Sequence, residues 1–493
     1  MLGQRTTLFL ISITWLFSLI RPGSAFGGRH FRKHVSQWRI ERECCRIDSR
    51  LLSTASPTPK VPSKFVPFPF QYREEVELHI ETLTNRGMGL ARYELTTGDD
   101  EASSKWVVMV PNVIPGERVK VAVFRNLKNY SEADLLEVLE PSADRVEPKC
   151  PLADTCGGCQ LQHLSIEAQR KWKTQFVKEN LLHYGLDIPV SSTLGTDEVY
   201  GYRSKLTPHF NAPSKTRRKA TDDNRVDPKV IEAIGFQSMT SRQIVDVEAC
   251  PIATEEINRK YREIRDELKA KPTDRRKGAT LLLRQGNPGD QHVETDHNQY
   301  ITTTVQGLGF TYLAGNFFQN NYFVLPLMVE HVIKEATKGG NMSHLIDCYC
   351  GSGLFAISAA DYFESVIGIE INEKAIKEAR ENAARNNRTN CEFVAASSEA
   401  IFENIEFPHE KSVVVLDPPR KGCSPDFLQQ LFKFRPKRIV YMSCDPMTQA
   451  RDSEQITEAG YSISSVQPFD LFPQTRHIEC LMIFDRNDGD IVD

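Results

Sequence analysis

Apolar and polar positions follow two different patterns along the chain, which predict an all-β region followed later by an α/β region. Between residues 75 and 148, short apolar stretches alternate with turn residues, as is typical of the strands of a small barrel. The five expected strands are residues 76–80, 87–92, 106–110, 119–124 and 134–139. Gly87, Gly89 and the adjacent Pro115 and Gly116 mark the tight turns of this barrel.

From residue 316 to the end of the chain, β-like runs alternate with helical stretches. The runs are residues 344–349, 365–370, 391–395, 413–416 and 438–442, and helical stretches such as residues 373–387 separate several of them. This alternation predicts a mainly parallel, doubly wound sheet, hence a Rossmann-like α/β domain. Two further runs, residues 461–466 and 478–484, would close the sheet as a pair.

Residues 146–315, between these regions, are expected to form a cysteine-rich α+β domain. A helix should begin after Ser165, which can cap it, and stop near Gly185. The polar and basic interruption at residues 214–229 is explained more simply as a solvated loop than as a specific RNA contact.

The first 66 residues have the layout of targeting segments. In residues 1–25, Arg5 precedes an apolar run at residues 8–20 and small residues follow it, as in a signal peptide. That run is shorter than the roughly 20 residues that span a bilayer, so a permanent anchor is the weaker alternative. Residues 26–66, rich in Arg, Ser and Pro, suit a transit segment. The junction before Phe26 resembles plastid presequences of diatoms and related algae, which predicts a plastid protein, with the secretory pathway or the mitochondrion as alternatives.

Composition narrows the class of protein. A chain of 493 residues is too long for one core, and 40% hydrophobic with 26% charged residues describes soluble globular domains. The formal charge of -4 means that any surface that binds a nucleic acid is local. No later segment could span a membrane, so no stable membrane association of the mature form is expected. The twelve cysteines do not form the pattern of a disulfide framework, which favours a reducing or plastid-like interior.

A glycine loop follows the first strand of the α/β region. Residues 347–353 read DCYCGSG, and glycines there let the backbone approach a ligand at the carboxyl edge of the sheet. Glu370 ends the second strand, where a carboxylate can bind the ribose of a dinucleotide or of S-adenosylmethionine. The DPPR turn at residues 417–420 favours S-adenosylmethionine, because a nicotinamide enzyme has no need for it. Arg420 stands where an enzyme that methylates amino groups normally has an aromatic residue.

Cys444 and Glu479 supply the two groups that methylation of carbon 5 of uracil requires. A thiolate added to carbon 6 makes carbon 5 nucleophilic, and a base must then remove the carbon 5 proton. Cys444 follows the fifth strand and Glu479 opens the last one, so both are expected at the carboxyl edge of the sheet. Taken alone, the first could be a small buried hydrophobe and the second a surface carboxylate.

Together these motifs resemble the RNA 5-methyluridine methyltransferase family, from about Glu75 to the C-terminus. The residues that carry the resemblance are NFFQNN at 316–321, DCYCGSG at 347–353, DPPR at 417–420 with Gly422, SCDP at 443–446 with Thr448, Arg451 and Asp452, and residues 470–479. The barrel resembles a TRAM domain, an RNA-binding module, through NRGMG at 85–89, VP at 110–111 and IPGE at 114–117. An unrelated small barrel is the alternative.

The resemblance implies a TRAM barrel at residues 70–145, the cysteine-rich domain at 146–315 and a class I methyltransferase domain at 316–493. It implies that Cys444 is the nucleophile and Glu479 the proton acceptor. It also implies residues that bind S-adenosylmethionine or frame the target base: Gln319, Tyr349, Glu370 and Asp417. Residues 395–398 (AASS) lack an acidic residue that family members often place near the adenine, and Leu354 stands where many have Asn.

Four cysteines have the spacing of a metal site. Cys150, Cys156 and Cys159 form C-x5-C-x2-C, and Cys250 supplies a fourth thiolate. Four thiolates suit zinc or a four-iron cluster, with a disulfide pair as the alternative. The long first gap is unusual for a zinc ribbon, and the glycine pair at 157–158 resembles the cluster-bearing branch of the family, which implies a structural [4Fe-4S] cluster.

The expected partner is RNA, either ribosomal or transfer RNA, rather than DNA, and the protein is expected to be a monomer. The target uridine would have to be extruded from its stack. Several basic side chains could contact phosphate, although solvated surface charge explains each: Arg170, Lys171, Lys173, Arg217 and Arg218. Two other interpretations stay open, a methyltransferase acting on another target and a non-catalytic RNA-binding protein that retains the scaffold.

Overall fold

The computed structural model describes residues 61–95, 104–215, 229–270, 276–396, 402 and 405–487. The chain divides into two units, Met1–Phe65 and Val66–Asp493, and the elements below belong to the second. The signal-peptide segment at 1–25, nearly all of the transit segment at 26–66, Ser397, Ser398, Arg217 and Arg218 lie outside the described residues. Among the described helices, none combines the length and the apolar character needed to cross a bilayer.

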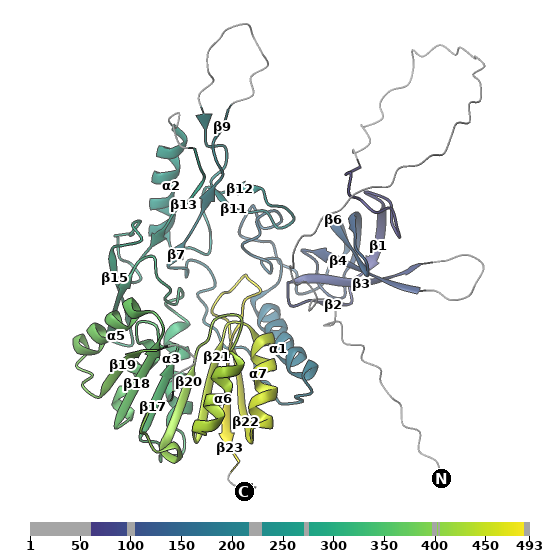
Figure 1. The fold of residues 1–493 in the computed structure, drawn as a ribbon. Helices are drawn as coiled ribbons and strands as arrows, with labels where there is room; N and C mark the ends of the chain where they lie inside the picture. The colour runs from purple at the N-terminus through teal and green to yellow at the C-terminus, as the bar shows by residue number, and fades with distance from the viewer. Residues whose placement is uncertain are drawn as a thin grey trace, which may run out of the picture. The chain divides into compact units, whose positions relative to one another are not determined.

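The N-terminal sheet is a small β structure in which all five expected strands are present (Figure 1). Its strands run in the order β1-β5-β6-β4-β3-β2. Their bounds are β1 Glu75–His79, β2 Thr82–Leu83, β3 Met88–Leu95, β4 Ser104–Pro111, β5 Arg118–Asn126 and β6 Tyr130–Glu140. Gly89 is required by close approach, because a Cβ there would lie 2.2 Å from a methyl carbon of Val113.

The middle of the chain contains two helices and short antiparallel strands. α1 spans Ile166–His183, and the Ser165 side chain caps it by accepting a hydrogen bond from the Ala168 N–H, as expected from the sequence. Gly185 follows the helix with φ 73°. The other elements are β7 Lys205–Leu206, β8 His209–Phe210, β9 Ser214–Lys215, β10 Lys229–Val230, β11 Gly235–Gln237, β12 Ile244–Asp246, α2 Glu255–Ala270, β13 Ala279–Thr280, β14 Leu283–Arg284, β15 Tyr300–Val305 and β16 Leu308–Leu313.

The C-terminal sheet confirms the predicted α/β architecture (Figure 1). Its order is β19-β18-β17-β20-β21-β23-β22, with parallel pairing from β19 to β21 and β23 inserted antiparallel between β21 and β22. The strands are β17 His344–Cys348, β18 Ser365–Glu370, β19 Cys391–Ala395, β20 Ser412–Leu416, β21 Arg438–Ser443, β22 Tyr461–Phe469 and β23 Glu479–Arg486. The helices are α3 Leu325–Thr337, α4 Leu354–Ala359, α5 Glu373–Arg385, α6 Pro425–Phe434 and α7 Pro446–Glu458.

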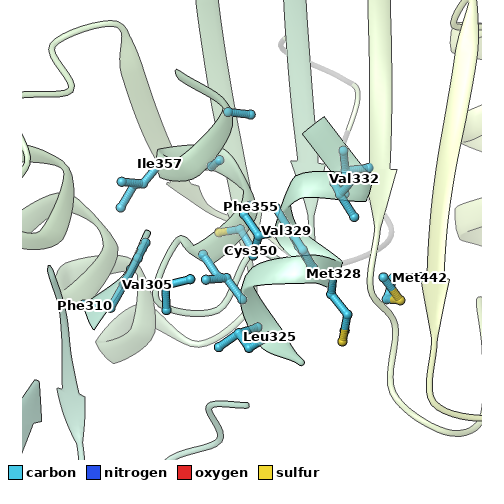
Figure 2. Packing of buried hydrophobic residues seen from close by; sticks show 14 of the residues in the cluster. Val305, Phe310, Leu325, Met328, Val329, Val332, Cys350, Phe355, Ile357 and Met442 are labelled. Atoms are coloured by element: carbon cyan, nitrogen blue, oxygen red, sulfur yellow. The ribbon is translucent and has the colours of Figure 1, made fainter. Parts of the chain in front are cut away.

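Both faces of this sheet are buried, as the nearly unbroken apolar strands require. One face packs against α3, α4 and α5; Figure 2 shows Met328 and Val332 of α3 gathered near Phe355 and Met442. The other face packs against α6, α7 and α1. Helix α1 therefore belongs to the core of the sheet although it precedes the first strand, β17, by about 160 residues.

Candidate active site

A cleft of about 710 Å³ lies at the carboxyl edge of the C-terminal sheet. It brings together all six residues expected at the catalytic and cofactor positions, which are Gln319, Tyr349, Glu370, Asp417, Cys444 and Glu479. These residues are spread over 160 positions of the sequence, and the ends of four parallel strands deliver most of them to one edge, because parallel strands terminate together.

The glycine loop after β17 has the strained backbone of a ligand-binding turn. Tyr349, Gly351 and Gly353 all have positive φ, at 67°, 54° and 92°. Asp347, the second-to-last residue of β17, is fully buried, and its Oδ2 accepts a 2.9 Å hydrogen bond from the N–H of Ala356 in α4. Burial raises the pKa of Asp347 to about 8. The loop is thus tied to α4 while its backbone faces the cleft.

Glu370 holds a defined position at the end of β18. Its Oε1 accepts a 3.0 Å hydrogen bond from the N–H of Asn372, and Asn372 in turn caps α5. The carboxylate is only partly buried and lines the cleft. A carboxylate fixed in this way retains acceptor capacity toward a ligand in the cleft.

Cys444 and Glu479 lie beside each other because of strand register. Ser443 of β21 pairs with Cys480 of β23. One residue further toward the edge of the sheet, Cys444 follows β21 and Glu479 begins β23. Residues facing each other across antiparallel strands have Cβ atoms about 4.5–5.5 Å apart. Glu479 is 3% exposed, and its Oε2 has no hydrogen-bond partner within the part of the chain that is described. The thiol and an unpaired carboxyl group therefore face the same space.

Burial and mutual repulsion raise the pKa of both groups. Burial first, and then the negative charges of Glu479 and Asp417, raise the pKa of Cys444 to about 12. Burial and Asp417 also raise the pKa of Glu479 well above its ordinary value, while Arg420 lowers the pKa of both groups. Burial raises the pKa of Asp417 to about 7. Such perturbed groups concentrate at functional sites.

Short-range hydrogen bonds fix the loop that carries the thiol. Asp445 caps α7 by accepting from the N–H groups of Met447 and Thr448 at 3.1 and 3.4 Å. Gln449 is fully buried, and its side-chain amide donates to the carbonyls of Tyr441 and Cys480, both at 2.9 Å. One side chain thus joins the strand that leads to Cys444 to the strand that begins at Glu479.

Asp452 is a supporting residue to which the sequence motif alone assigned no role. It is fully buried and accepts hydrogen bonds from the Cys423 N–H and the Tyr441 hydroxyl, both at 2.8 Å. Arg451 bonds to Asp452 and, at 3.0 Å, to the carbonyl of Lys421. Asp452 therefore fastens the segment after the DPPR turn to α7. The available signal in the sequence was its place in the helix that directly follows Cys444.

The expectation that Lys173 contacts phosphate or solvent is wrong. Its ammonium group is fully buried and donates to Asp470 Oδ1 at 2.5 Å. Arg170 also lies against Asp470, at 3.4 Å. A polar helix sequence suggested an exposed face, but α1 is packed on the sheet and its charges meet a carboxylate some 300 positions away. Lys171 is exposed.

The four cysteines of the middle region lie near one another as free thiols. Burial and the charges of Cys250, Cys156 and Cys150 raise the pKa of Cys159 to about 12. Burial raises the pKa of Cys250 to about 11. No three His, Cys, Asp or Glu side chains in the described segments converge tightly enough to hold a single metal ion. The thiols share one neighbourhood without forming a compact ion site.

Comparison with known proteins identifies the sequence family. A family model described as tRNA (Uracil-5-)-methyltransferase matches residues 255–487, and a TRAM domain model matches residues 69–136. The tRNA (uracil(54)-C(5))-methyltransferase of Schizosaccharomyces pombe is 37% identical over 433 residues, covering 84% of this chain and 79% of the relative. The 23S rRNA (uracil(1939)-C(5))-methyltransferase of Shewanella sediminis is 28% identical, covering 84% and 97%.

A solved structure shows the same fold. The crystal structure of Pyrococcus abyssi tRNA (uracil-54, C5)-methyltransferase in complex with S-adenosyl-L-homocysteine matches with a TM-score of 0.58 at 24% identity. The match covers 83% of this chain and 100% of the archaeal chain. Together with the TRAM match, it confirms the expected class I methyltransferase fold preceded by a small barrel.

Proposed function

This chain belongs to the tRNA (uracil-5-)-methyltransferase family, and from that premise we propose that it methylates carbon 5 of a uridine in RNA with S-adenosylmethionine as methyl donor. One observation carries the proposal. Cys444 supplies a thiol and Glu479 an unpaired carboxyl group from the ends of adjacent strands, and both line one cleft together with the glycine loop. A scaffold that only bound RNA would have no use for this pair.

In the proposed reaction, the Cys444 thiol gives its proton to solvent, and its thiolate adds to carbon 6 of the uracil, which leaves an enolate with negative charge shared by carbon 5. Carbon 5 then takes the methyl group of S-adenosylmethionine, whose sulfur keeps the electron pair of the broken bond. Glu479 removes the carbon 5 proton, the bond between carbon 6 and sulfur breaks, and the Cys444 thiolate is restored. Arg420, which lowers the pKa of both reacting groups, favours their ionised forms.

We propose that the donor lies against the glycine loop and Glu370. The carboxylate of Glu370 keeps an oxygen for the ribose hydroxyls, since the Asn372 N–H occupies only Oε1. Gln319 and Asp417 line the same cleft between the loop and Cys444, where they would frame the methyl group and the target base. Tyr349, held at positive φ, would contact the donor.

For the RNA, we propose that a second cleft of about 830 Å³ receives the strand around the target. Basic and aromatic side chains line it: Arg86, Phe124 and Arg125 from the barrel, Phe236 from the middle region and Arg476 from the C-terminal domain. Relatives named for transfer RNA and for ribosomal RNA both match this chain, so either is the proposed substrate class.

We also propose that residues 1–66 direct import into a plastid. A fluorescent fusion of residues 1–66 found elsewhere in the cell would refute this proposal.

For the cysteines, we propose a structural [4Fe-4S] cluster on Cys150, Cys156, Cys159 and Cys250. Four thiols that influence one another's pKa supply the donor set, and backbone N–H groups beside Cys156 and Cys250 would stabilise the thiolates. Protein purified without oxygen should contain iron and acid-labile sulfide, and Cys159→Ser should lose both. Zinc without sulfide would contradict the proposal.

The function is tested with RNA that carries 5-fluorouridine. Carbon 5 of 5-fluorouridine carries fluorine in place of the proton that Glu479 would remove. The reaction should therefore stop at a methylated covalent adduct between RNA and protein. Mass spectrometry of the digested adduct should place it on Cys444. A Cys391→Ala variant, which alters a partly buried thiol on the edge strand β19, should still form the adduct. Methylation of a base nitrogen, or an adduct at another residue, would overturn the proposal.

A further inference from the structure

Residues 470–478 form a loop that leads from β22 into Glu479, the first residue of β23; we name it the base loop. Gln474 stands in its middle with φ 72°, a left-handed conformation that residues other than glycine rarely adopt, and is only 3% exposed. Such a conformation persists only where the surroundings over-determine it. The base loop is therefore held in place by contacts rather than by its own preference.

Gln169 of α1 supplies the central contact. Its side-chain oxygen accepts a hydrogen bond from the Gln474 N–H at 2.8 Å, and its amide group donates to Gln474 Oε1 at 2.9 Å and to the Leu164 carbonyl at 3.0 Å. Gln169 is 1% exposed, so no water competes for these bonds. The two glutamines thus form a reciprocal, buried pair across 305 positions of sequence.

The segment that follows Cys159 holds the opposite side of the same peptide. The backbone N–H groups of Gln160 and Leu161 both donate to the Gln474 carbonyl, at 3.2 and 3.0 Å. The N–H, carbonyl and side-chain oxygen of Gln474 are therefore all bonded to residues of the middle region. Its left-handed conformation is the one that these partners select.

Further anchors fix the beginning of the base loop. Lys173 donates to Asp470 Oδ1 and to the Phe472 carbonyl, at 2.5 and 3.0 Å. The carbonyls of Leu471 and Pro473 accept from Asn321 and Tyr202 side chains, both at 2.9 Å. Residues 470–474 are thus fixed one after another, all from outside the two strands that the loop joins.

We infer that Gln169 is a positioning residue for Glu479, acting through Gln474 and the base loop. The inference rests on the proposed role of Glu479 as the base. The carboxyl group has one oxygen without a partner, so the backbone at the start of β23 sets its place. A misplacement of about 1 Å at a reacting group can cost about 100-fold in rate. Releasing Gln474 should therefore slow proton removal specifically.

The experiment compares Gln169→Ala with Gln175→Ala. Gln175 lies on the same helix, and among the described residues its side chain bonds only to Glu179 one turn on, so its loss removes an amide from α1 without touching the base loop. For Gln169→Ala we expect kcat to fall about 100-fold while KM for the methyl donor stays within about twofold. Because the blocked step follows methylation, the methylated adduct should accumulate with ordinary uridine. Gln175→Ala should behave as the wild type.

A second-site variant separates positioning from general damage. Glycine adopts positive φ without strain, so Gln474→Gly should let the base loop keep its conformation without Gln169. The Gln169→Ala, Gln474→Gly double variant should recover about tenfold in kcat over Gln169→Ala alone. A fold damaged elsewhere would not be rescued by shortening this side chain.

Hydrogen exchange of residues 470–478 supplies a readout that needs no methyl transfer. Exchange there should accelerate in Gln169→Ala and not in Gln175→Ala. A wild-type protein inactive on all RNA would refute the proposed function. An active wild type whose Gln169→Ala variant keeps its kcat, or shows unchanged exchange in the base loop, would overturn the positioning role alone.

Discussion

The two loops that carry the proposed reacting groups, Cys444 and Glu479, are supported in different ways. The thiol loop, Ser443 to Pro446, is held by its own neighbours: the Ser443 hydroxyl bonds to the backbone of Asp445, and Asp445 caps the helix that follows. The base loop is held by side chains and amides some 300 positions earlier in the chain. The thiol is placed by local structure, whereas the base is placed by how the middle region packs on the sheet.

Because the two loops are held independently, damage to each should block a different step of the proposed reaction. Damage to the thiol loop should remove bond formation to the RNA. Damage to the base loop should leave that bond intact and block its resolution. Four substitutions test the contrast, beginning with those that remove the proposed reacting groups.

Cys444→Ala should abolish methyl transfer, by at least about 10⁴-fold, because no other group in the cleft can replace a covalent nucleophile. The measurement is transfer of labelled methyl to RNA under single-turnover conditions. Binding of the methyl donor, followed by calorimetry, should change little, because Cys444 lies outside the glycine loop. Methyl transfer within tenfold of the wild type would exclude a covalent mechanism.

Glu479→Gln should reduce turnover by about 10³-fold, within the range that general bases contribute, yet leave one methylation event intact. The methylated RNA should then remain attached to Cys444, visible as a protein band of raised mass on denaturing gels. The variant is nearly isosteric, and it removes a carboxyl group whose pKa burial already raises, so folding should not suffer. If free methylated RNA were produced at the normal rate, a residue other than Glu479 would have to remove the carbon 5 proton.

The same contrast explains how much the sequence could predict. The strands of the C-terminal sheet have continuous apolar runs, and the glycine loop, Asp417, Cys444 and Glu479 each directly follow or begin one of them, so the cleft could be assembled from patterns of a few residues. The barrel strands could also be predicted from local patterns, because short apolar stretches alternate with turn residues there. Local patterns also indicated the cap of α1 at Ser165.

Long-range pairs left no such signal. Gln169 and Gln474 are ordinary polar residues in the sequence, and only the packing of α1 on the sheet makes them partners. Three basic residues lie within positions 170–173, so the sequence suggested that Lys173 is a surface charge. In the structure it is buried and forms an ion pair with Asp470. Which face of a weakly amphipathic helix is buried depends on tertiary contacts that periodicity does not contain.

Lys173→Met should destabilise the fold by about 3 kcal/mol, since it leaves the fully buried carboxylate of Asp470 without its ammonium partner. Chemical unfolding measures this loss. Lys171→Met, an exposed change two positions away, should stay within about 0.5 kcal/mol of the wild type. Adding Asp470→Asn to Lys173→Met should restore part of the loss, because it removes a buried charge that would keep only the longer 3.4 Å contact with Arg170. Equal stabilities of the two single variants would show that the pair is not buried.

Arg420→Ala should have the smallest effect, about fivefold on kcat/KM at pH 7, since an exposed charge contributes at most about 1 kcal/mol. Arg420 lowers the pKa of both Cys444 and Glu479, so its removal raises both, and the ionised forms needed for attack and proton removal become scarcer at neutral pH. The loss should stay about fivefold from pH 7 to 9, because the ionised fraction of Cys444 rises in parallel in both proteins while the pH is far below a pKa of about 12. Lys421→Ala, at the same cleft, serves as the control, because Lys421 has no part in either shift. A loss confined to KM for RNA, with kcat unchanged, would mean that Arg420 acts by binding RNA rather than on the proposed reacting pair.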